Sequence, residues 1–248
     1  MNDDLQERLK KANEPGRQAS ALHKFYQGKM ETTLKCALRD ANDFAIWYTP
    51  GVAEPCKAIK QNKEAVYEYT SKWNTIAVVS DGTRVLGLGD IGPVAGMPVM
   101  EGKAVLFDKL VGISGIPILL DSKDPDQIVE TICRIAPTFG AIKLEDIAAP
   151  DCFAIEQRLV EQLDVPIMHD DQHGTAVVVL ASLLNVTRFT STRLQNATVG
   201  IIGLGAAGTG IALQRGEHQP IGGVDDRLAH VVDRVDVAPA LVGRAGRR

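Results

Sequence analysis

Hydrophobic and polar positions alternate regularly along the chain from about Gly115 onward. Short apolar runs of strand length, "GIPILLD", "GAIKLED" and "VPIM", are separated by two longer stretches, "SKDPDQIVETICRIAP" and "DCFAIEQRLVEQL". In each longer stretch the apolar residues recur at helical spacing: Ile128, Ile132 and Ile135 in the first, and Ile155, Leu159 and Leu163 in the second. Strands and helices that alternate in this way predict βαβ units around a mostly parallel sheet.

The segments before this block give a different pattern. Residues 1–72 are charge-rich and predicted to be helical, with interruptions at Pro50-Gly51 and at Pro55. The stretch "NTIAVVSDGTRVLGLGD" then contains two strand-like runs on either side of Asp81-Gly82, which predicts a β-hairpin.

The segments after the block predict a second domain. "TAVVVLASLLNVTRF" is expected to form a largely buried helix, and "NATVGIIGLGAAGTGIALQ" a strand, a glycine turn and a helix. The stretch 188–196 is polar and lacks apolar periodicity, so we place a domain boundary there. The fold class is therefore α/β, with one domain over residues 1–190 and an incomplete Rossmann-type domain over 191–248.

Composition narrows the function classes. The 248 residues include 45% hydrophobic and 23% charged side chains, as in a soluble globular protein, and the net charge of −4 does not favour nucleic acid as a partner. "TAVVVLASLL" is too short to span a membrane, which takes roughly 20 residues, and the polar start predicts no secretory signal. No CxxC pair is present, so neither a zinc site nor a disulfide framework is expected and a reducing cytoplasm is the predicted location; the cysteines are Cys36, Cys56, Cys133 and Cys152.

Carboxylates follow two of the predicted strands at the point where each ends. "GAIKLED" finishes in Glu145 and Asp146, and "VPIMHDD" finishes in Asp170 and Asp171. The carboxyl ends of parallel strands share one edge, where open α/β sheets bind ligands. Four acids there repel one another unless a cation lies among them, and oxygen ligands favour Mg²⁺ or Mn²⁺ over Zn²⁺. The pattern predicts a divalent-cation site; the alternative is that these acids cap the helices that follow.

Three neighbouring polar residues are assigned structural roles. Asp151 is expected to cap the helix that it precedes. His169 and His173 are expected to form hydrogen bonds around the acids and are not counted as ligands.

A glycine-rich turn is the second candidate site. In "GIIGLGAAG", Gly203, Gly205 and Gly208 have the GxGxxG spacing, after an apolar run and before a helical pattern. That context is typical of a dinucleotide-binding turn, in which the backbone and a helix amino end approach a pyrophosphate. Asp225 lies where a ribose-binding acid is expected and favours NAD over NADP; the alternative is an ordinary βα turn with an acid there by chance.

Longer strings identify a family. "YTPGVAEPC" (48–56), "DGTRVLGLGDIGPVAGMPVMEGKAVLF" (81–107), "KLEDIAAPDCFAIE" and "HDDQHGTAVVVLASLLN" resemble the characteristic segments of malic enzyme, most closely the shorter bacterial and archaeal type. The resemblance runs from about residue 28 to residue 214. It implies oxidative decarboxylation of malate to pyruvate and CO₂ with NAD or NADP and with Mg²⁺ or Mn²⁺, and a homodimer in which the amino-terminal helices pack on a partner.

The resemblance also implies roles for single residues. Three acids would be the metal ligands and a fourth would hydrogen-bond near the catalytic lysine: Glu145, Asp146 and Asp171 as ligands, with Asp170 beside them. Lys103 would be the general base at the C2 hydroxyl of malate, Arg84 would hold a substrate carboxylate, and Tyr48 would protonate the enol of pyruvate. Without the resemblance, each of these residues also has an ordinary interpretation. Lys103 and Arg84 could be surface charges, and Tyr48 could be a packed aromatic side chain.

The resemblance fades after Gln214. The last 34 residues contain six arginines and no lysine, whereas residues 1–143 contain all 13 lysines of the chain. A dinucleotide domain needs further βα units beyond its second strand. The sequence therefore predicts a malic enzyme cut short in its nucleotide domain, with a tail from about residue 215 that is either native or translated in a shifted frame.

Two other hypotheses remain open at this point. The first is a catalytically impaired chain that folds, binds metal and self-associates through exposed apolar surface. The second is another NAD-linked enzyme with a lysine base, such as an amino-acid dehydrogenase, which the paired acids disfavour because amino-acid oxidation needs no metal. Metal binding without turnover would favour the first, and insensitivity to chelation the second.

Overall fold

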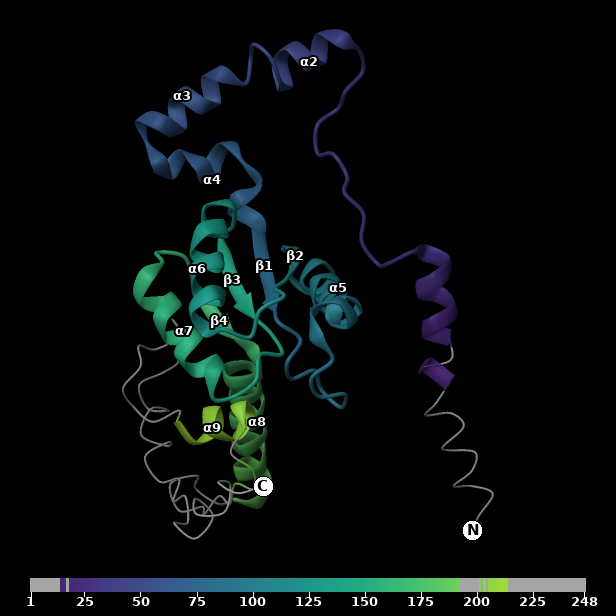
Figure 1. Cartoon of the computed structure of the whole chain (residues 1–248), viewed down its shortest axis with the longest axis vertical. Helices are drawn as coiled ribbons and strands as arrows, with labels where there is room; N and C mark the ends of the chain where they lie inside the picture. Colours follow the sequence, from purple (N-terminus) through teal and green to yellow (C-terminus); the bar gives the residue numbers. More distant parts are fainter. Residues whose placement is uncertain (1–13, 17, 192–200, 202, 204, 214–248) are drawn as a thin grey trace.

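The computed structural model describes residues 14–16, 18–191, 201, 203 and 205–213. At its centre is a four-stranded sheet in which every pairing is parallel and the strand order is β2-β1-β3-β4 (Figure 1). The strands are β1 (Thr75–Ser80), β2 (Ser114–Leu119), β3 (Ala141–Leu144) and β4 (Ile167–His169). The predicted parallel sheet is confirmed, and each of the three apolar runs forms one of its strands.

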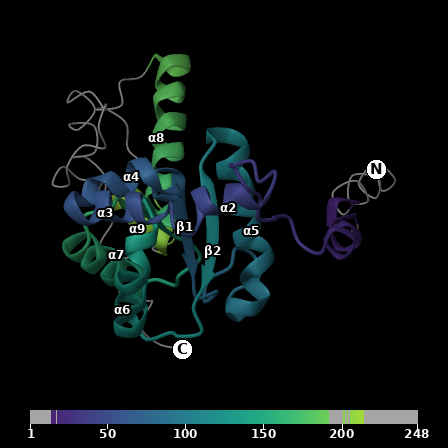
Figure 2. The same ribbon diagram turned by 90° about the horizontal axis from the view of Figure 1, so that it is seen from above.

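Helices cover both faces of this sheet. The connections are α5 (Gly92–Val111) between β1 and β2, α6 (Pro125–Ile135) and the short η3 (Ala136–Thr138) between β2 and β3, and α7 (Asp151–Gln162) between β3 and β4. Figure 2 shows α6 and α7 on one side of the sheet and α5 on the other. On β1, Ala77 and Val79 pack in the core with α6 and α7, while Val78 points toward α5. This alternation buries the central strand on both faces.

The two crossover helices match their predicted patterns. The Asp124 side chain accepts a hydrogen bond from the Asp126 N–H, and Pro125 occupies the first turn of α6. Ile132 of α6 and Ile155 of α7 are fully buried, and both belong to the same hydrophobic core. Asp151 is the first residue of α7, so its charge lies in the first turn as the helix dipole favours, but Pro150 is the N-cap and Asp151 makes no side-chain cap bond.

The hairpin predicted around Asp81 and Gly82 is also wrong. β1 pairs with parallel strands on both sides, and the residues after it form turns with an isolated antiparallel bridge between Val85 and Gly89. The Asp81 carboxylate accepts hydrogen bonds from the N–H and the hydroxyl of Thr83, at 3.0 and 2.6 Å, and Gly82 adopts a φ of 69°. These bonds close a tight turn at the end of β1, and glycine permits its left-handed backbone.

The amino-terminal region is helical in part. Its elements are α2 (Ala41–Trp47), α3 (Ala53–Gln61), η1 (Lys63–Ala65), α4 (Val66–Tyr69) and η2 (Ser71–Asn74), and residues 18–26 are also helical. Most of residues 30–39 lack regular structure and form an extended link (Figure 1). Pro50-Gly51 separates α2 from α3 as predicted, whereas Pro55 lies in the first turn of α3 and does not interrupt it, because a proline is tolerated there.

The last two helices are α8 (Asp170–Thr190) and α9 (Ala206–Leu213), which pack against one another. The prediction that α8 is largely buried is wrong for the described part of the chain. Gln172 and Ala176 in its first two turns are buried, but Val178 is 65% and Phe189 91% exposed. The prediction rested on the apolar composition of this segment. It failed because α8 extends past the edge of the sheet (Figure 1). Among the described residues, no helix has the length and apolarity to cross a membrane.

Candidate functional site

Three carboxylates meet at the carboxyl edge of the sheet. β3 and β4 are neighbours with Leu144 paired to His169, so the residues that follow both strands emerge side by side. Oxygen atoms of the three acids lie within 4.8 Å of one another, and the acids are Glu145, Asp146 and Asp171. These are the three residues to which the resemblance assigns the metal. A close set of oxygen ligands with little exposure suits a divalent cation.

The backbone fixes this carboxylate cluster. Asp146 has a φ of 54°, in the left-handed region, and its N–H donates to Asp171 Oδ2 at 2.9 Å. That bond ties the end of β3 to the start of α8. Burial, with the negative charges of Glu145 and Asp171, raises the pKa of Asp146 to about 6. A positive charge close to Asp146 would therefore stabilise the ionised form of its carboxyl group.

Two lysines, one on α5 and one on β3, contact the same acids. Lys103, on α5, places its Nζ 2.9 Å from Glu145 Oε1 and 3.2 Å from Asp170 Oδ2. Lys143, on β3, contacts Glu145 Oε2 and lies 3.1 Å from Asp170 Oδ2. Burial disfavours the charged form of Lys103, but Glu145 and Asp170 outweigh it and raise the Lys103 pKa. Burial likewise opposes the charge on Asp170, and the two lysines overcome it and lower the Asp170 pKa.

Hydrogen-bonded side chains from α7 and from the start of α8 pack around the carboxylate cluster. His169 is fully buried, its Nδ1 lies 2.9 Å from Gln172 Nε2, and its Nε2 lies 3.1 Å from Asp171 Oδ2 without the alignment of a hydrogen bond. Burial would raise the pKa of Asp171, but His169 and the Asp146 N–H favour the carboxylate and lower it. His173 Nε2 lies 2.9 Å from Glu156 Oε2. Both histidines therefore form the supporting contacts expected of them.

Arg84 lies beside the cluster through its backbone. Its N–H donates to the carbonyl of Asp146 at 2.9 Å, and the hydroxyl of Thr83 accepts from the N–H of Ala148 at 2.9 Å. The turn after β1 is thereby docked on the loop after β3. The Arg84 side chain is exposed and free to approach an anion at this edge.

Tyr48 lies apart from these residues. It ends α2, and its side chain is 70% exposed. Figure 1 places α2 beyond the end of the sheet at which β1 begins, whereas the carboxylates lie at the end where the strands finish. Within the described part of one chain, Tyr48 and Lys103 are therefore not brought together.

The glycine turn lies against the helix that carries Asp170 and Asp171. Gly203 has a φ of 99°, and α9 begins three residues later. A Cβ on Gly208 would lie 1.9 Å from the Gly203 carbonyl oxygen, and a Cβ on Gly210 would lie 2.9 Å from the Gln172 Cα. Glycine at these positions lets α9 pack closely on the turn and on the first turn of α8.

Other parts of the nucleotide prediction lie outside the described residues. Asp225 is among them, as is most of the strand expected before Gly203. Gly205 is described, and its carbonyl accepts a hydrogen bond from the Thr209 N–H at 2.9 Å as the helix begins.

Three contributors to the site were missed from the sequence. Asp81 is buried at the same sheet edge, where burial raises its pKa. Glu156 reaches the site from α7, and no spacing along the chain points to it. Lys143 did leave a signal, because a lysine inside the apolar run "GAIKLED" calls for a buried partner.

Comparison with known proteins assigns the family. Residues 27–160, more than half of the chain, match the family model for the malic enzyme N-terminal domain, and residues 172–230 match that for the malic enzyme NAD binding domain. The chain belongs to the malic enzyme family. The family assignment made from the sequence strings is confirmed.

Relatives with either nicotinamide cofactor are similar to this malic enzyme chain. The NAD-dependent malic enzyme of Geobacillus stearothermophilus is 53% identical over 198 residues, which are 79% of this chain and 41% of the relative. The NADP-dependent malic enzyme of Escherichia coli is 46% identical over 187 residues, 75% of this chain and 25% of the relative. The chain thus spans under half the length of the curated relatives it matches.

A solved structure has the same fold. The malic enzyme from Pyrococcus horikoshii superposes with a TM-score of 0.74 at 51% sequence identity, over 75% of this chain and 43% of that one. The α/β architecture with a parallel sheet, followed by part of a nucleotide-binding domain, is therefore that of malic enzymes.

Proposed function

We propose that this chain carries out the metal-assisted oxidative decarboxylation of malate to pyruvate and CO₂, with NAD or NADP as hydride acceptor. The observation that carries the proposal is the contact of Lys103 with Glu145, inside a carboxylate cluster at the carboxyl edge of the sheet. A base, a cation site and a nucleotide turn next to one another are what this reaction needs. The family membership supports the same conclusion.

Glu145, Asp146 and Asp171 would hold Mg²⁺ or Mn²⁺. Their oxygen atoms are close enough to share one ion, and the raised pKa of Asp146 marks a site that gains from positive charge. When bound, the ion polarises the C2 oxygen and offsets the carboxylates that keep Lys103 protonated.

Lys103 would take the proton of the C2 hydroxyl as the C2 hydride leaves to the nicotinamide ring. Its Nζ is held by two carboxylates, and its side chain is 29% exposed, so it remains open to substrate. Asp170 would position the Lys103 amino group for this proton transfer. Arg84, whose backbone is fixed to Asp146, would bind a carboxylate of malate by a charge-assisted contact.

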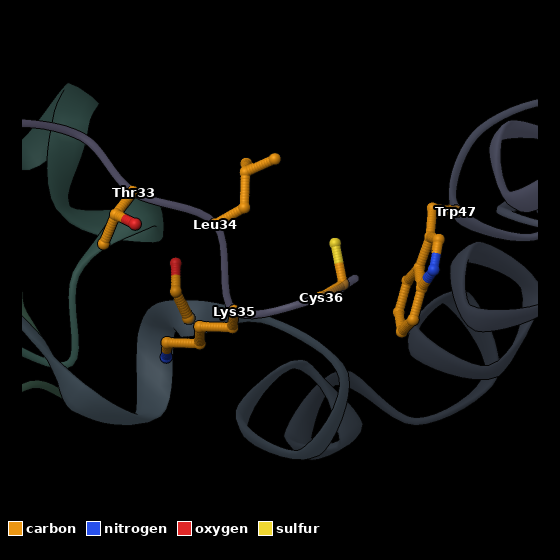
Figure 3. A pocket seen from close by; sticks show the side chains of 6 residues that line it. Thr33, Leu34, Lys35, Cys36 and Trp47 are labelled. Atoms are coloured by element: carbon orange, nitrogen blue, oxygen red, sulfur yellow. The ribbon is translucent and has the colours of Figure 1, made fainter. Parts of the chain in front are cut away.

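Tyr48 would protonate the C3 carbon of the enol after CO₂ departs. Because α2, which Tyr48 follows directly, lies beyond the opposite end of its own sheet, we propose that Tyr48 reaches the cluster of a second copy in a homodimer. The amino-terminal segments expose apolar side chains that such a contact would cover. Trp47, the residue before Tyr48, is one of six residues that line a hollow of about 410 Å³, together with Leu34 and Cys36 among others (Figure 3).

The nucleotide would bind at the glycine turn. Gly203, Gly205 and Gly208 open α9, whose amino end can face a pyrophosphate. We propose residues 1–190 as the substrate and metal domain and 191–248 as the nucleotide part, in which Asp225 would contact the ribose. The cysteines Cys36, Cys56, Cys133 and Cys152 are all unpaired, which supports a location in the reducing cytoplasm.

The test is formation of NADH or NADPH, followed at 340 nm, from L-malate by the purified chain with Mn²⁺. The proposal predicts a signal that a chelator abolishes and that K103Q lowers at least a hundredfold. K109Q, at an exposed lysine on the same helix, is the matched control and should keep the activity. A folded chain that binds Mn²⁺ but forms no reduced nucleotide would instead favour the metal-binding, self-associating alternative.

A further inference from the structure

Lys143 is a buried charge that the proposed reaction does not use. It lies in the middle of the sheet on β3 and is 4% exposed. Its ammonium contacts Glu145 Oε2, lies 3.1 Å from Asp170 Oδ2, and stands 5.5 Å from the ring centre of Phe107. A lysine is seldom enclosed in this way without a carboxylate partner. Both of its carboxylate partners belong to the catalytic surroundings.

Lys143 and Lys103 share these partners. Lys103 takes the other oxygen of Glu145, at 2.9 Å, and the same oxygen of Asp170, at 3.2 Å. Both oxygen atoms of Glu145 therefore face an ammonium group. A divalent cation that uses Glu145 must displace or share one of these contacts.

The two lysines differ in their freedom to move. The Lys103 side chain is 29% exposed, whereas that of Lys143 is 6% exposed and lies between the sheet and Phe107. The Lys103 side chain reaches solvent, whereas the Lys143 side chain is almost fully enclosed. The Lys143 side chain is therefore held next to the carboxylate cluster.

We propose that Lys143 is an internal counter-ion of the metal site. It positions Glu145 and Asp170 in the metal-free chain, and it weakens cation binding because it competes for Glu145. This inference rests on the proposed metal site. Four carboxylates and two ammonium groups leave two net negative charges, which one divalent cation balances. Without Lys143 the surplus of negative charge would grow, and a cation would be held more tightly.

The test compares Mn²⁺ affinity by isothermal titration calorimetry in chelator-treated chains. K143Q should bind Mn²⁺ at least ten times more tightly than the unmodified chain, because it frees Glu145 Oε2 and removes a positive charge. K143R retains the charge and should stay within about twofold of the unmodified affinity. K123Q removes an exposed lysine that pairs with Asp90 and is the control, with no expected change. Equal or weaker binding by folded K143Q would overturn the proposal, since a purely structural role predicts loss of affinity.

If K143Q is too unstable for calorimetry, its melting temperature with and without Mn²⁺ provides a second test. The metal-free K143Q chain should melt at a lower temperature than the unmodified chain, and Mn²⁺ should raise its melting temperature by the larger amount. If K143Q is unfolded without metal, Mn²⁺ should restore the fold, and a chain that stays unfolded in Mn²⁺ overturns the proposal. A folded unmodified chain that binds no Mn²⁺ overturns the proposed metal site as well, whereas binding that K143Q does not strengthen overturns the Lys143 inference alone.

Discussion

The Oε1 atom of Glu156 accepts a hydrogen bond of 2.7 Å from the backbone N–H of His169. Its other oxygen accepts from Gln172 Nε2 at 3.1 Å and lies 2.9 Å from His173 Nε2. One carboxylate on α7 therefore holds the junction between β4 and α8, where two of the acids of the site begin the helix. The position of the cation site depends on a residue that is not a ligand.

We expect E156Q to loosen this junction. The amide would present N–H donors to groups that are themselves donors, and leaving such groups without an acceptor costs roughly 1–3 kcal/mol. The free energy of unfolding, measured by urea denaturation, should fall by about that amount, and Mn²⁺ affinity should fall with it. E161Q, at an exposed acid on the same helix, should change neither quantity. An E156Q chain as stable as the unmodified one would show that the junction holds without this carboxylate.

Gly174 makes room for Asp170. A Cβ on Gly174 would lie 2.2 Å from Asp170 Oδ1, so an alanine there must push the carboxylate away from Lys103 and Lys143. Alanine favours a helix over glycine by roughly 1 kcal/mol, which offsets part of the cost of moving Asp170 away from the two lysines, so G174A should remain folded. Its rate of NAD(P)H formation should nevertheless fall more than tenfold. G102A on α5, where a Cβ meets nothing within 4 Å, is the control, and equal activity in both variants would refute the role of Asp170.

The raised pKa of Asp146 predicts a pH-dependent stability. The folded chain binds the Asp146 proton with a pKa of about 6, against an ordinary value of 3.8. The stabilisation from this proton is complete below pH 3.8 and is lost as the pH rises through 6. In chelator, D146N should therefore gain stability relative to the unmodified chain between pH 4 and pH 7, by roughly 2–3 kcal/mol.

Denaturant unfolding of both chains across this pH range measures the difference. D164N, at an exposed carboxylate, is the control. A D146N difference that stays constant with pH would mean that burial and the neighbouring charges do not act on Asp146 as described.

Local patterns along the chain predicted the sheet and the meeting of the acids, because both follow from strand length and from the parallel pairing of β3 and β4. The strand-like run after Asp81 failed as a prediction, since side-chain bonds to Thr83 turn the chain there. Pattern also could not give the exposure of α8, which depends on what packs beside it. Glu156 is 13 residues from His169 and on another element, so only the fold shows that the two meet.

Cation binding by Glu145, Asp146 and Asp171 is what the proposed reaction depends on most directly. Electron paramagnetic resonance of Mn²⁺ during titration of the metal-free chain counts the bound ions. We predict one tightly bound ion per chain, which a chelator releases, and no binding by the folded variant E145Q/D146N/D171N. Binding of equal strength in that variant, or no binding by the folded unmodified chain, would contradict this prediction.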